Sequence, residues 1–228
     1  LFKDKKKQEL INSRTFNKNC LRTDLGKGYV YKTTLIVKLI SLVVNKFATL
    51  DPCGMGVEME SEKPGWYDAL NGLPGIFGSS MSETYELQRY CEFILESLNK
   101  MKSKSASISL PFEVYRFLDQ VTTILTKYYE SQTIDQEYDY WNSVADVREK
   151  YREQVSYGFI GDEREITSGR LKQIFSLFLR KIKEGINRAV KMNNGRYPTY
   201  FYFEVKKYTM IQNSNGASKV NEKNQAYV

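Results

Sequence analysis

A carboxylate stands beside two aromatic residues and several glycines in the segment 65–75, which reads GWYDALNGLPG. Aromatic faces can stack on sugar rings, and a carboxyl group beside them can have its pKa raised by desolvation. Asp68, with Trp66 and Tyr67 next to it, therefore has the chemistry of a general acid in glycoside cleavage. The alternative is a capped turn, in which Asp68 accepts hydrogen bonds from backbone N–H groups. The residue types alone leave both interpretations open.

The loop that contains this segment spans residues 51–80, which is long for a connection inside a compact domain. Loops of this length without regular structure are usually functional or disordered. Its aromatic and branched apolar residues favour an ordered, functional loop. Glu58, Glu60 and Lys63 are candidates for contacts with sugar hydroxyls, or alternatively for a charged loop surface.

Two further groups of residues are candidates for the same site. Arg22 and Asp24 precede a possible short strand at Tyr29–Tyr31 and are candidates for lining the same cleft. The run Ser80–Glu83 has the sequence of a capping box, in which Glu83 bonds back to the Ser80 N–H group. Glu83 is therefore a helix cap, a site residue, or both.

The sequence contains no histidine. This excludes Ser-His-Asp and Cys-His nucleophilic chemistry and histidine-ligated zinc. Any acid–base chemistry must fall to carboxylates, Lys, Tyr or Cys. Three widely spaced cysteines without a CxxC pair indicate reduced thiols in a cytoplasmic protein, and we expect no metal site and no bound cofactor.

The formal net charge is +7, but the basic residues are scattered along the chain. A nucleic-acid interface needs them gathered on one face or stripe, so nucleic acid is not an expected partner. No apolar run reaches the roughly eighteen residues that span a membrane, so no membrane partner is expected.

The loop 51–80 lies between amphipathic helices. Apolar residues at helical spacing predict helices over 34–48, 81–101, 112–129, 139–157 and 168–192, and residues 3–13 read as a short charged helix. Residues 197–211 are rich in Tyr, Phe and Val and predict a short β element. Residues 212–228 predict a polar, disordered tail. Long helices with short connections favour antiparallel helical hairpins in a mainly α fold.

The run Trp66-Tyr67-Asp68-Ala69-Leu70-Asn71 resembles the catalytic-loop pattern of cellobiose and chitobiose phosphorylases and related inverting glycosidases. That pattern is Trp-Asn-Asp-(Gly/Ala)-(Leu/Met)-Asn, followed by a glycine-rich turn and by Gly-Glu-Ser at a helix start. The resemblance implies that Asp68 is the general acid and that Glu83 is a second catalytic residue. Trp66, Tyr67 and Asn71 lie in the matching run and are candidate substrate contacts, as are Lys63, Glu60, Arg22 and Asp24. Tyr67 and Ser82 depart from the pattern, which leaves the substrate open.

The resemblance is strong over residues 21–86 and weaker as far as 211. It implies an (α/α)6 toroid built from six helical hairpins, of which this chain has helices for about half. Residues 1–211 are then a partial catalytic domain, and the rest of the barrel comes from a longer chain or another copy. The expected partner is an oligosaccharide, with inorganic phosphate as co-substrate if the enzyme is a phosphorylase.

The phosphate-binding residues of that family include a histidine, which this chain lacks, so hydrolysis and phosphorolysis both remain open. The alternative function is a non-catalytic helical module that binds carbohydrate or protein through the aromatic loop.

Overall fold

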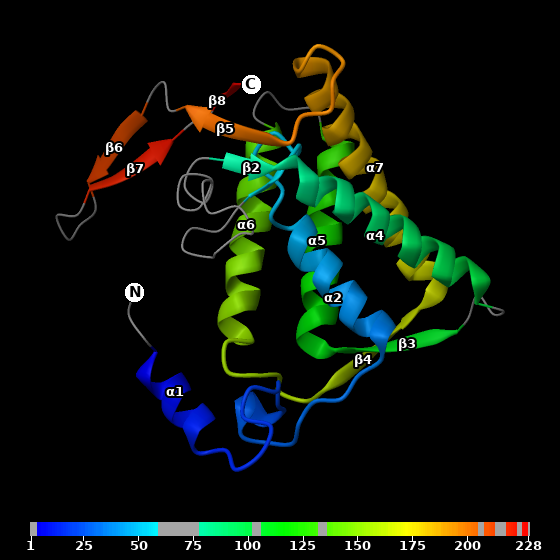
Figure 1. The fold of residues 1–228 in the computed structure, drawn as a ribbon, viewed down its shortest axis with the longest axis vertical. Coiled ribbons are helices and arrows are strands. Elements are labelled where there is room, and N and C mark those ends of the chain that lie inside the picture. The colour runs from blue at the N-terminus through cyan, green and yellow to red at the C-terminus, as the bar shows by residue number, and fades with distance from the viewer. Residues whose placement is uncertain are drawn as a thin grey trace.

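A computed structural model describes residues 4–58, 78–101, 106–131, 136–204, 208–212, 218–222 and 225–227, with backbone alone from residue 203 on. The described part is mainly α-helical with small antiparallel sheets (Figure 1). Its helices are α1 (Lys5–Asn12), the 3₁₀ turn η1 (Asp24–Gly26), α2 (Leu35–Phe47), α4 (Met81–Lys100), α5 (Phe112–Glu130), α6 (Gln136–Gln154) and α7 (Ser168–Met192).

The helix boundaries follow the capping signals in the sequence closely. Ser80 precedes α4, and its side chain accepts a hydrogen bond from the Glu83 N–H group at 3.3 Å. Thr167 caps α7 in the same way through the Arg170 N–H group at 3.2 Å. Thr34 occupies the N-cap position of α2 without a side-chain cap bond. Helix α6 begins at Gln136 rather than near residue 139.

The helices pack around one apolar core. Helix α4 lies along α7 and α5 lies along α6, while α2 contacts both α4 and α5. The Phe47 ring stacks on Phe178 with 3.9 Å between centroids, which joins α2 to α7. Phe117 stacks on Tyr151 at 4.4 Å and joins α5 to α6. Because buried aromatic side chains remove large apolar areas from water, these pairs stabilise the bundle strongly.

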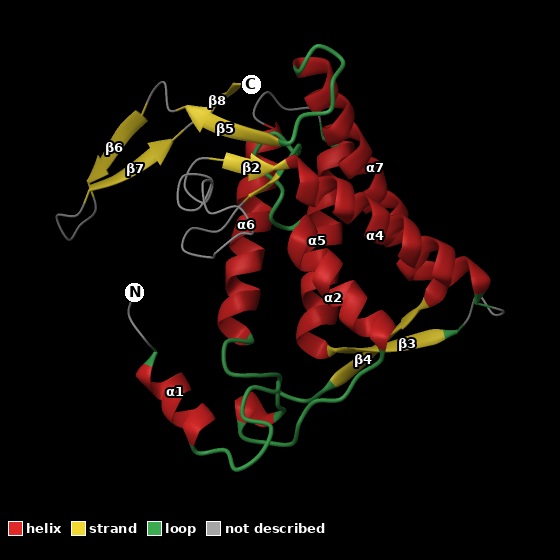
Figure 2. Ribbon diagram, viewed as in Figure 1, coloured by secondary structure: helices red, strands yellow, loops and turns green. Residues whose placement is uncertain are grey.

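Short strands lie at both ends of the bundle (Figure 2). At the end near the C-terminal part of α7, an antiparallel sheet has the order β1-β2-β5-β8. Its strands are β1 (Val57–Glu58), β2 (Gly78–Ser80), β5 (Tyr200–Glu204) and β8 (Gln225–Tyr227). At the other end β3 (Ser107–Pro111) pairs with β4 (Glu163–Thr167). A separate ribbon joins β6 (Tyr208–Gln212) to β7 (Ser218–Glu222).

The strands were harder to predict than the helices. Strands β5 and β6 fall where residues 197–211 predict a β element. The tail from residue 212, predicted as disordered, contains β7 and β8, because strand pairing through the backbone needs no apolar sequence. The predicted strand at Tyr29–Tyr31 is reduced to one bridge between Arg22 and Val30.

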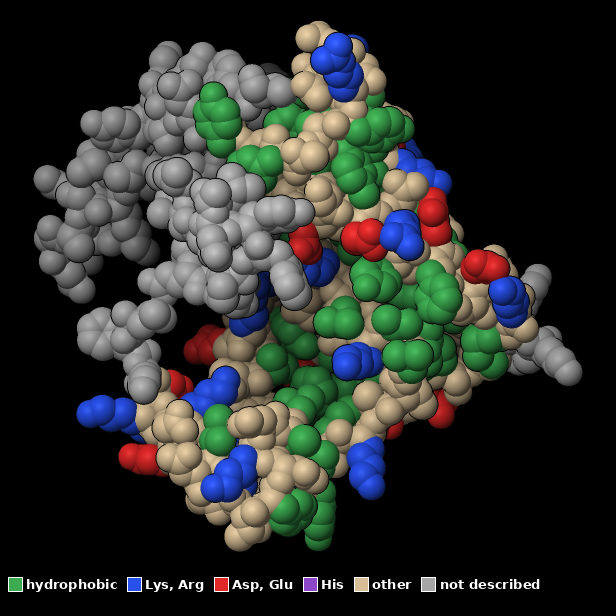
Figure 3. Space-filling model, viewed as in Figure 1, with side chains coloured by type: hydrophobic (Ala, Val, Ile, Leu, Met, Phe, Trp, Pro, Cys, Tyr) green, Lys and Arg blue, Asp and Glu red, His purple; other side chains and the backbone are tan. Residues whose placement is uncertain are grey.

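Hydrophobic side chains are exposed over α2 and α4 on the face seen in Figure 3. The large exposed ones on these helices are Leu35, Leu42, Tyr90 and Phe93, which are between 48% and 70% exposed. Within the described residues, no helix combines the length and the apolar character needed to cross a membrane.

Candidate functional site

The segment 59–77 lies outside the described residues. The predicted site residues Glu60, Lys63, Trp66, Tyr67, Asp68 and Asn71 therefore have no described position. The structure does describe both ends of this segment. Strands β1 and β2 pair with Val57 opposite Ser80 and Glu58 opposite Ser79, so the residues on either side of the segment lie side by side.

The carboxylate of Asp51 joins the two ends of the loop. It is 2% exposed and accepts hydrogen bonds from the N–H groups of Cys53 at 3.0 Å, Met55 at 2.9 Å and Gly56 at 2.7 Å. The Ser79 hydroxyl, on the returning strand, donates to the same carboxylate at 2.6 Å. Burial raises the pKa of Asp51, and these hydrogen bonds oppose the rise. Asp51 therefore shapes the outgoing arm of the loop, residues 51–58, and ties to it the returning arm, residues 78–80. These two arms together form the loop base.

Helix α7 supports the outgoing arm by direct backbone contact. A Cβ atom added at Gly185 would lie 1.8 Å from the Gly54 carbonyl oxygen, so only glycine lets the two backbones approach this closely. Gly54 itself has a backbone φ of +66°, a conformation that residues other than glycine rarely adopt. Glycine is therefore required on both sides of this contact.

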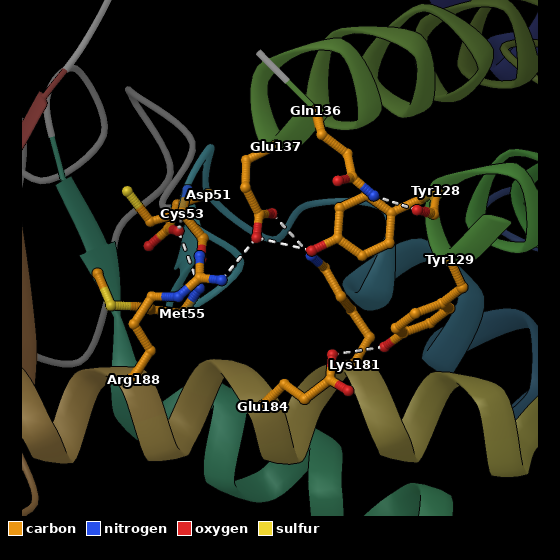
Figure 4. Close-up of polar contacts among 10 residues, drawn as sticks. All are labelled: Asp51, Cys53, Met55, Tyr128, Tyr129, Gln136, Glu137, Lys181, Glu184 and Arg188. Carbon is orange, nitrogen blue, oxygen red and sulfur yellow. Dashed lines mark hydrogen bonds and ion pairs between the residues drawn. The ribbon is translucent and has the colours of Figure 1, made fainter. Parts of the chain in front are cut away.

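A charged network lies next to the same arm and joins α6 to α7 (Figure 4). Glu137, in the first turn of α6, forms an ion pair with Lys181 of α7 at 2.7 Å and another with Arg188 at 2.6 Å. The Tyr128 hydroxyl donates to Glu137 at 2.7 Å. Arg188 also donates to the Cys53 carbonyl oxygen at 2.5 Å. Arg188 thus links the first turn of α6 to the loop base.

Lys181 is the most buried cation of this network. Its side chain is 3% exposed, and its ammonium group lies 3.8 Å from the centroid of the Tyr128 ring and 4.9 Å from that of Tyr140. Burial lowers the pKa of Lys181, while Glu137 opposes that shift. Two ring faces and one carboxylate therefore replace the water that a lysine usually has around it.

Glu137 is held in its ionised form. Burial alone would raise its pKa, but Lys181, Arg188 and the Tyr128 hydroxyl together hold the pKa of Glu137 below its ordinary value. Both carboxylate oxygens accept hydrogen bonds from these partners. These contacts join α6 to α7 through one shared carboxylate.

A second carboxylate, Glu58, stands on β1 at the point where the described part of the outgoing arm ends. Its side chain is 26% exposed. The Trp141 indole N–H donates to it at 3.0 Å, and Arg148 lies 3.5 Å from its other oxygen. Burial raises the pKa of Glu58, and Arg148 and Trp141 oppose the rise. Glu58 is therefore a partly buried carboxylate paired with α6.

Glu83 has a described position in the first turn of α4. Its N–H group completes the cap on Ser80, and its carboxylate forms an ion pair with Lys46 at 2.7 Å, with side chains 41% and 52% exposed. The Ser80 half of the predicted capping box is present. The Glu83 carboxylate, predicted to bond back to the Ser80 N–H group, pairs with Lys46 of α2 instead. Glu83 borders the returning arm of the loop and keeps its place as a candidate site residue.

The structure does not bring Arg22 and Asp24 to the loop base. They lie in the segment between α1 and α2, at the opposite end of the bundle from β2 (Figure 1). Arg22 is 7% exposed and donates to the carbonyl oxygens of Phe16 and Gly28. Asp24 lies in the turn η1, where its N–H group donates to Ile160. Helix α2 carries the chain across the bundle between these two residues and Asp51 (Figure 1).

Several residues of the site were missed by sequence reasoning. Neither Asp51 nor Lys181 is among the predicted site residues. A usable signal existed for Lys181, because it shares the helical spacing of the buried residues Phe178, Ile182 and Gly185. Glu137 and Arg188 carry no such signal, since their partners come from distant segments.

Among the described residues, no group of three or more Cys, Asp or Glu side chains is placed to hold a metal ion. No protein-family model matches the chain, and a search of curated proteins returns no significant match.

Proposed function

We propose that the protein is a carbohydrate-active enzyme that cleaves an oligosaccharide glycosidic bond, with Asp68 as the general acid. The chemical basis is the run from Trp66 to Asn71, which resembles the acid-bearing loop of inverting glycoside phosphorylases and hydrolases. The observation that carries the proposal is the Asp51 carboxylate, which accepts four hydrogen bonds and so fixes both arms of that loop at one point.

A fixed loop base is what a general acid on a loop requires. The acid must come within hydrogen-bond reach of the glycosidic oxygen, and small misplacements cost large factors in rate. Asp51 fixes the start of the loop, and the Ser79 hydroxyl ties the returning strand to it. Gly185 and Arg188 of α7 contact the outgoing arm at Gly54 and Cys53. A loop that served only as a connection would not require buried charges at its base.

We extend the proposal to the architecture. The antiparallel packing of α4 on α7 and of α5 on α6 is compatible with part of an (α/α)6 toroid. The exposed apolar side chains of α2 and α4 support a larger assembly, because contiguous apolar surface usually marks a contact. The remainder of the barrel would come from a longer chain or from another copy.

The choice between hydrolysis and phosphorolysis depends on what attacks the anomeric carbon. An inverting hydrolase needs a carboxylate base roughly 6.5–9.5 Å from the acid, whereas a phosphorylase needs a phosphate pocket. Both routes use the same general acid, so the role proposed for Asp68 does not depend on the choice.

The test is turnover of cellobiose and chitobiose by the full-length protein, with and without inorganic phosphate. We expect Asp68→Asn to lower kcat on the order of 10²–10⁴-fold. A matched control is Asp146→Asn, which removes an exposed carboxylate from α6. Equal turnover by the wild type and Asp68→Asn would refute the assignment. Binding that is lost in Trp66→Ala but kept in Asp68→Asn, without turnover by the wild type, would support a non-catalytic binding module instead.

A further inference from the structure

The carboxylate of Glu58 has a setting that differs from that of the other described acids near the loop base. It is mostly buried, yet it stands at the end of β1, as the last described residue before the segment 59–77. Among the described residues, the Trp141 indole and the Arg148 guanidinium reach its two oxygens. A carboxylate offers about four acceptor positions, so these two donors orient Glu58 without using its full capacity.

Helix α6 carries two neighbouring aromatic side chains, one of which donates a hydrogen bond to Glu58. Tyr138 and Trp141 are both half-buried, and their ring centroids lie 5.7 Å apart with the planes tilted by 42°. They are neighbours at helical spacing, so both project from the same side of α6. The indole is fixed through its N–H bond to Glu58, which leaves its ring oriented relative to the carboxylate.

Arg148, two turns further along α6, makes this arrangement rigid. Its side chain is 13% exposed and donates at 3.0 Å to the Ala48 carbonyl oxygen, at the C-terminal end of α2. It also contacts Glu149 at 3.0 Å. Because Arg148 is already paired with Glu58 and Glu149, the group as a whole carries no excess positive charge that would favour an anionic ligand.

We propose that Glu58, Tyr138 and Trp141 form a saccharide-binding subsite beside the loop base, which takes a neutral sugar ring. The rings supply apolar faces for the C–H face of a pyranose, and Glu58 accepts hydrogen bonds from its hydroxyls. The ligand class rests on the proposed function, since the segment that follows Glu58 in the sequence would carry the general acid. The subsite itself binds sugar without reacting with it.

The experiment uses the fluorescence of Trp141. The chain has two tryptophans, so Trp66→Phe leaves Trp141 as the reporter. Cellotetraose, laminaritetraose and chitotetraose are titrated separately, with erythritol as a polyol control. We expect a saturable change in Trp141 emission with at least one tetrasaccharide and none with erythritol. Calorimetry on the wild type measures the same affinities with Trp66 in place.

Variants then assign the binding to this subsite. We expect Glu58→Gln and Tyr138→Ala each to weaken binding about tenfold, while Glu149→Gln, which changes an exposed acid paired with the same arginine, leaves it unchanged. Thermal unfolding shows which variants remain folded, and calorimetry on Trp141→Phe, which keeps an apolar ring, replaces any that do not. Absence of saturable binding by all three sugars, or unchanged affinity in both Glu58→Gln and Tyr138→Ala, would overturn the subsite.

Failure of the subsite and failure of the proposed reaction give different results. If wild-type turnover depends on Asp68 but no sugar changes Trp141 emission, only the subsite is wrong. If sugars bind through Glu58 and Tyr138 but turnover does not depend on Asp68, only the reaction is wrong. Binding that persists in Asp68→Asn supports the subsite as a site separate from the acid.

Discussion

At the scale of single residues, buried carboxylates at the loop base have different functions according to their donors. Asp51 faces three backbone N–H groups and one hydroxyl, and therefore fixes chain geometry. Glu137 faces two cations and a phenol, and therefore joins two helices. Glu58 faces an indole and a guanidinium on α6. The role of each carboxylate therefore depends on the hydrogen-bond donors around it and not on its residue type.

Replacing Asp51 should disrupt the loop base. Asp51→Asn exchanges one acceptor oxygen for an NH₂ group that faces buried donors, which leaves some of them unsatisfied. We expect the free energy of unfolding to fall by about 2–5 kcal/mol, measured by urea denaturation. The exposed control Asp146→Asn should change it by less than about 0.5 kcal/mol. Equal stability of the two variants would show that Asp51 does not hold the loop.

The ion pairs of Glu137 should make the thermal stability of the protein depend on pH. Its partners hold its pKa below the ordinary value in the folded state. A carboxylate with a lowered folded-state pKa contributes stability above its unfolded pKa and loses that contribution as the pH falls through the folded value. We expect wild-type Tm to fall more steeply than that of Glu137→Gln as the pH falls below about 4.5. The control Glu130→Gln should follow the wild type, and parallel curves for wild type and Glu137→Gln would contradict the account.

At the scale of elements, the position of α7 against the loop depends on glycine. Gly185→Ala would place a Cβ atom 1.8 Å from the Gly54 carbonyl oxygen, so the loop or the helix must move. We expect a loss of about 1–3 kcal/mol in the free energy of unfolding despite the better helix propensity of alanine. Asn187→Ala, on the exposed side of the same helix, should be neutral or slightly stabilising. If Gly185→Ala is as stable as Asn187→Ala, α7 does not support the loop in this way.

The sequence predicts the long helices well because each buries a continuous apolar stripe that local spacing reveals. Helix α7 is predicted over 168–192 and observed over Ser168–Met192. Strands β3 and β4 escape prediction because each has only a few alternating residues, and because pairing of Ile108 with Ile166 joins segments far apart in the chain. The same limit applies to the site. Lys181 lies on the buried stripe of α7, but no local pattern places Glu137 beside it.

At the scale of the whole molecule, the apolar side chains exposed on α2 and α4 predict association. We expect the 228-residue chain to self-associate with increasing concentration in light scattering, because its exposed Leu42 and Phe93 are not covered. The double variant Leu42→Gln with Phe93→Gln should reduce this association. Tyr29→Gln, which removes an 87% exposed ring elsewhere, should not. Unchanged association in the double variant would mean that this face is not a contact surface.

The measurement that tests the central claim most directly compares leaving groups in Asp68→Asn. A general acid matters for a sugar leaving group, which must be protonated, and matters little for a dinitrophenyl group, which leaves as a stable anion. The proposal therefore predicts that Asp68→Asn lowers kcat for cellobiose on the order of 10²–10⁴-fold but lowers kcat for the dinitrophenyl β-glucoside far less. An equal loss on both substrates, or no loss on either, would contradict the role of Asp68 as the general acid.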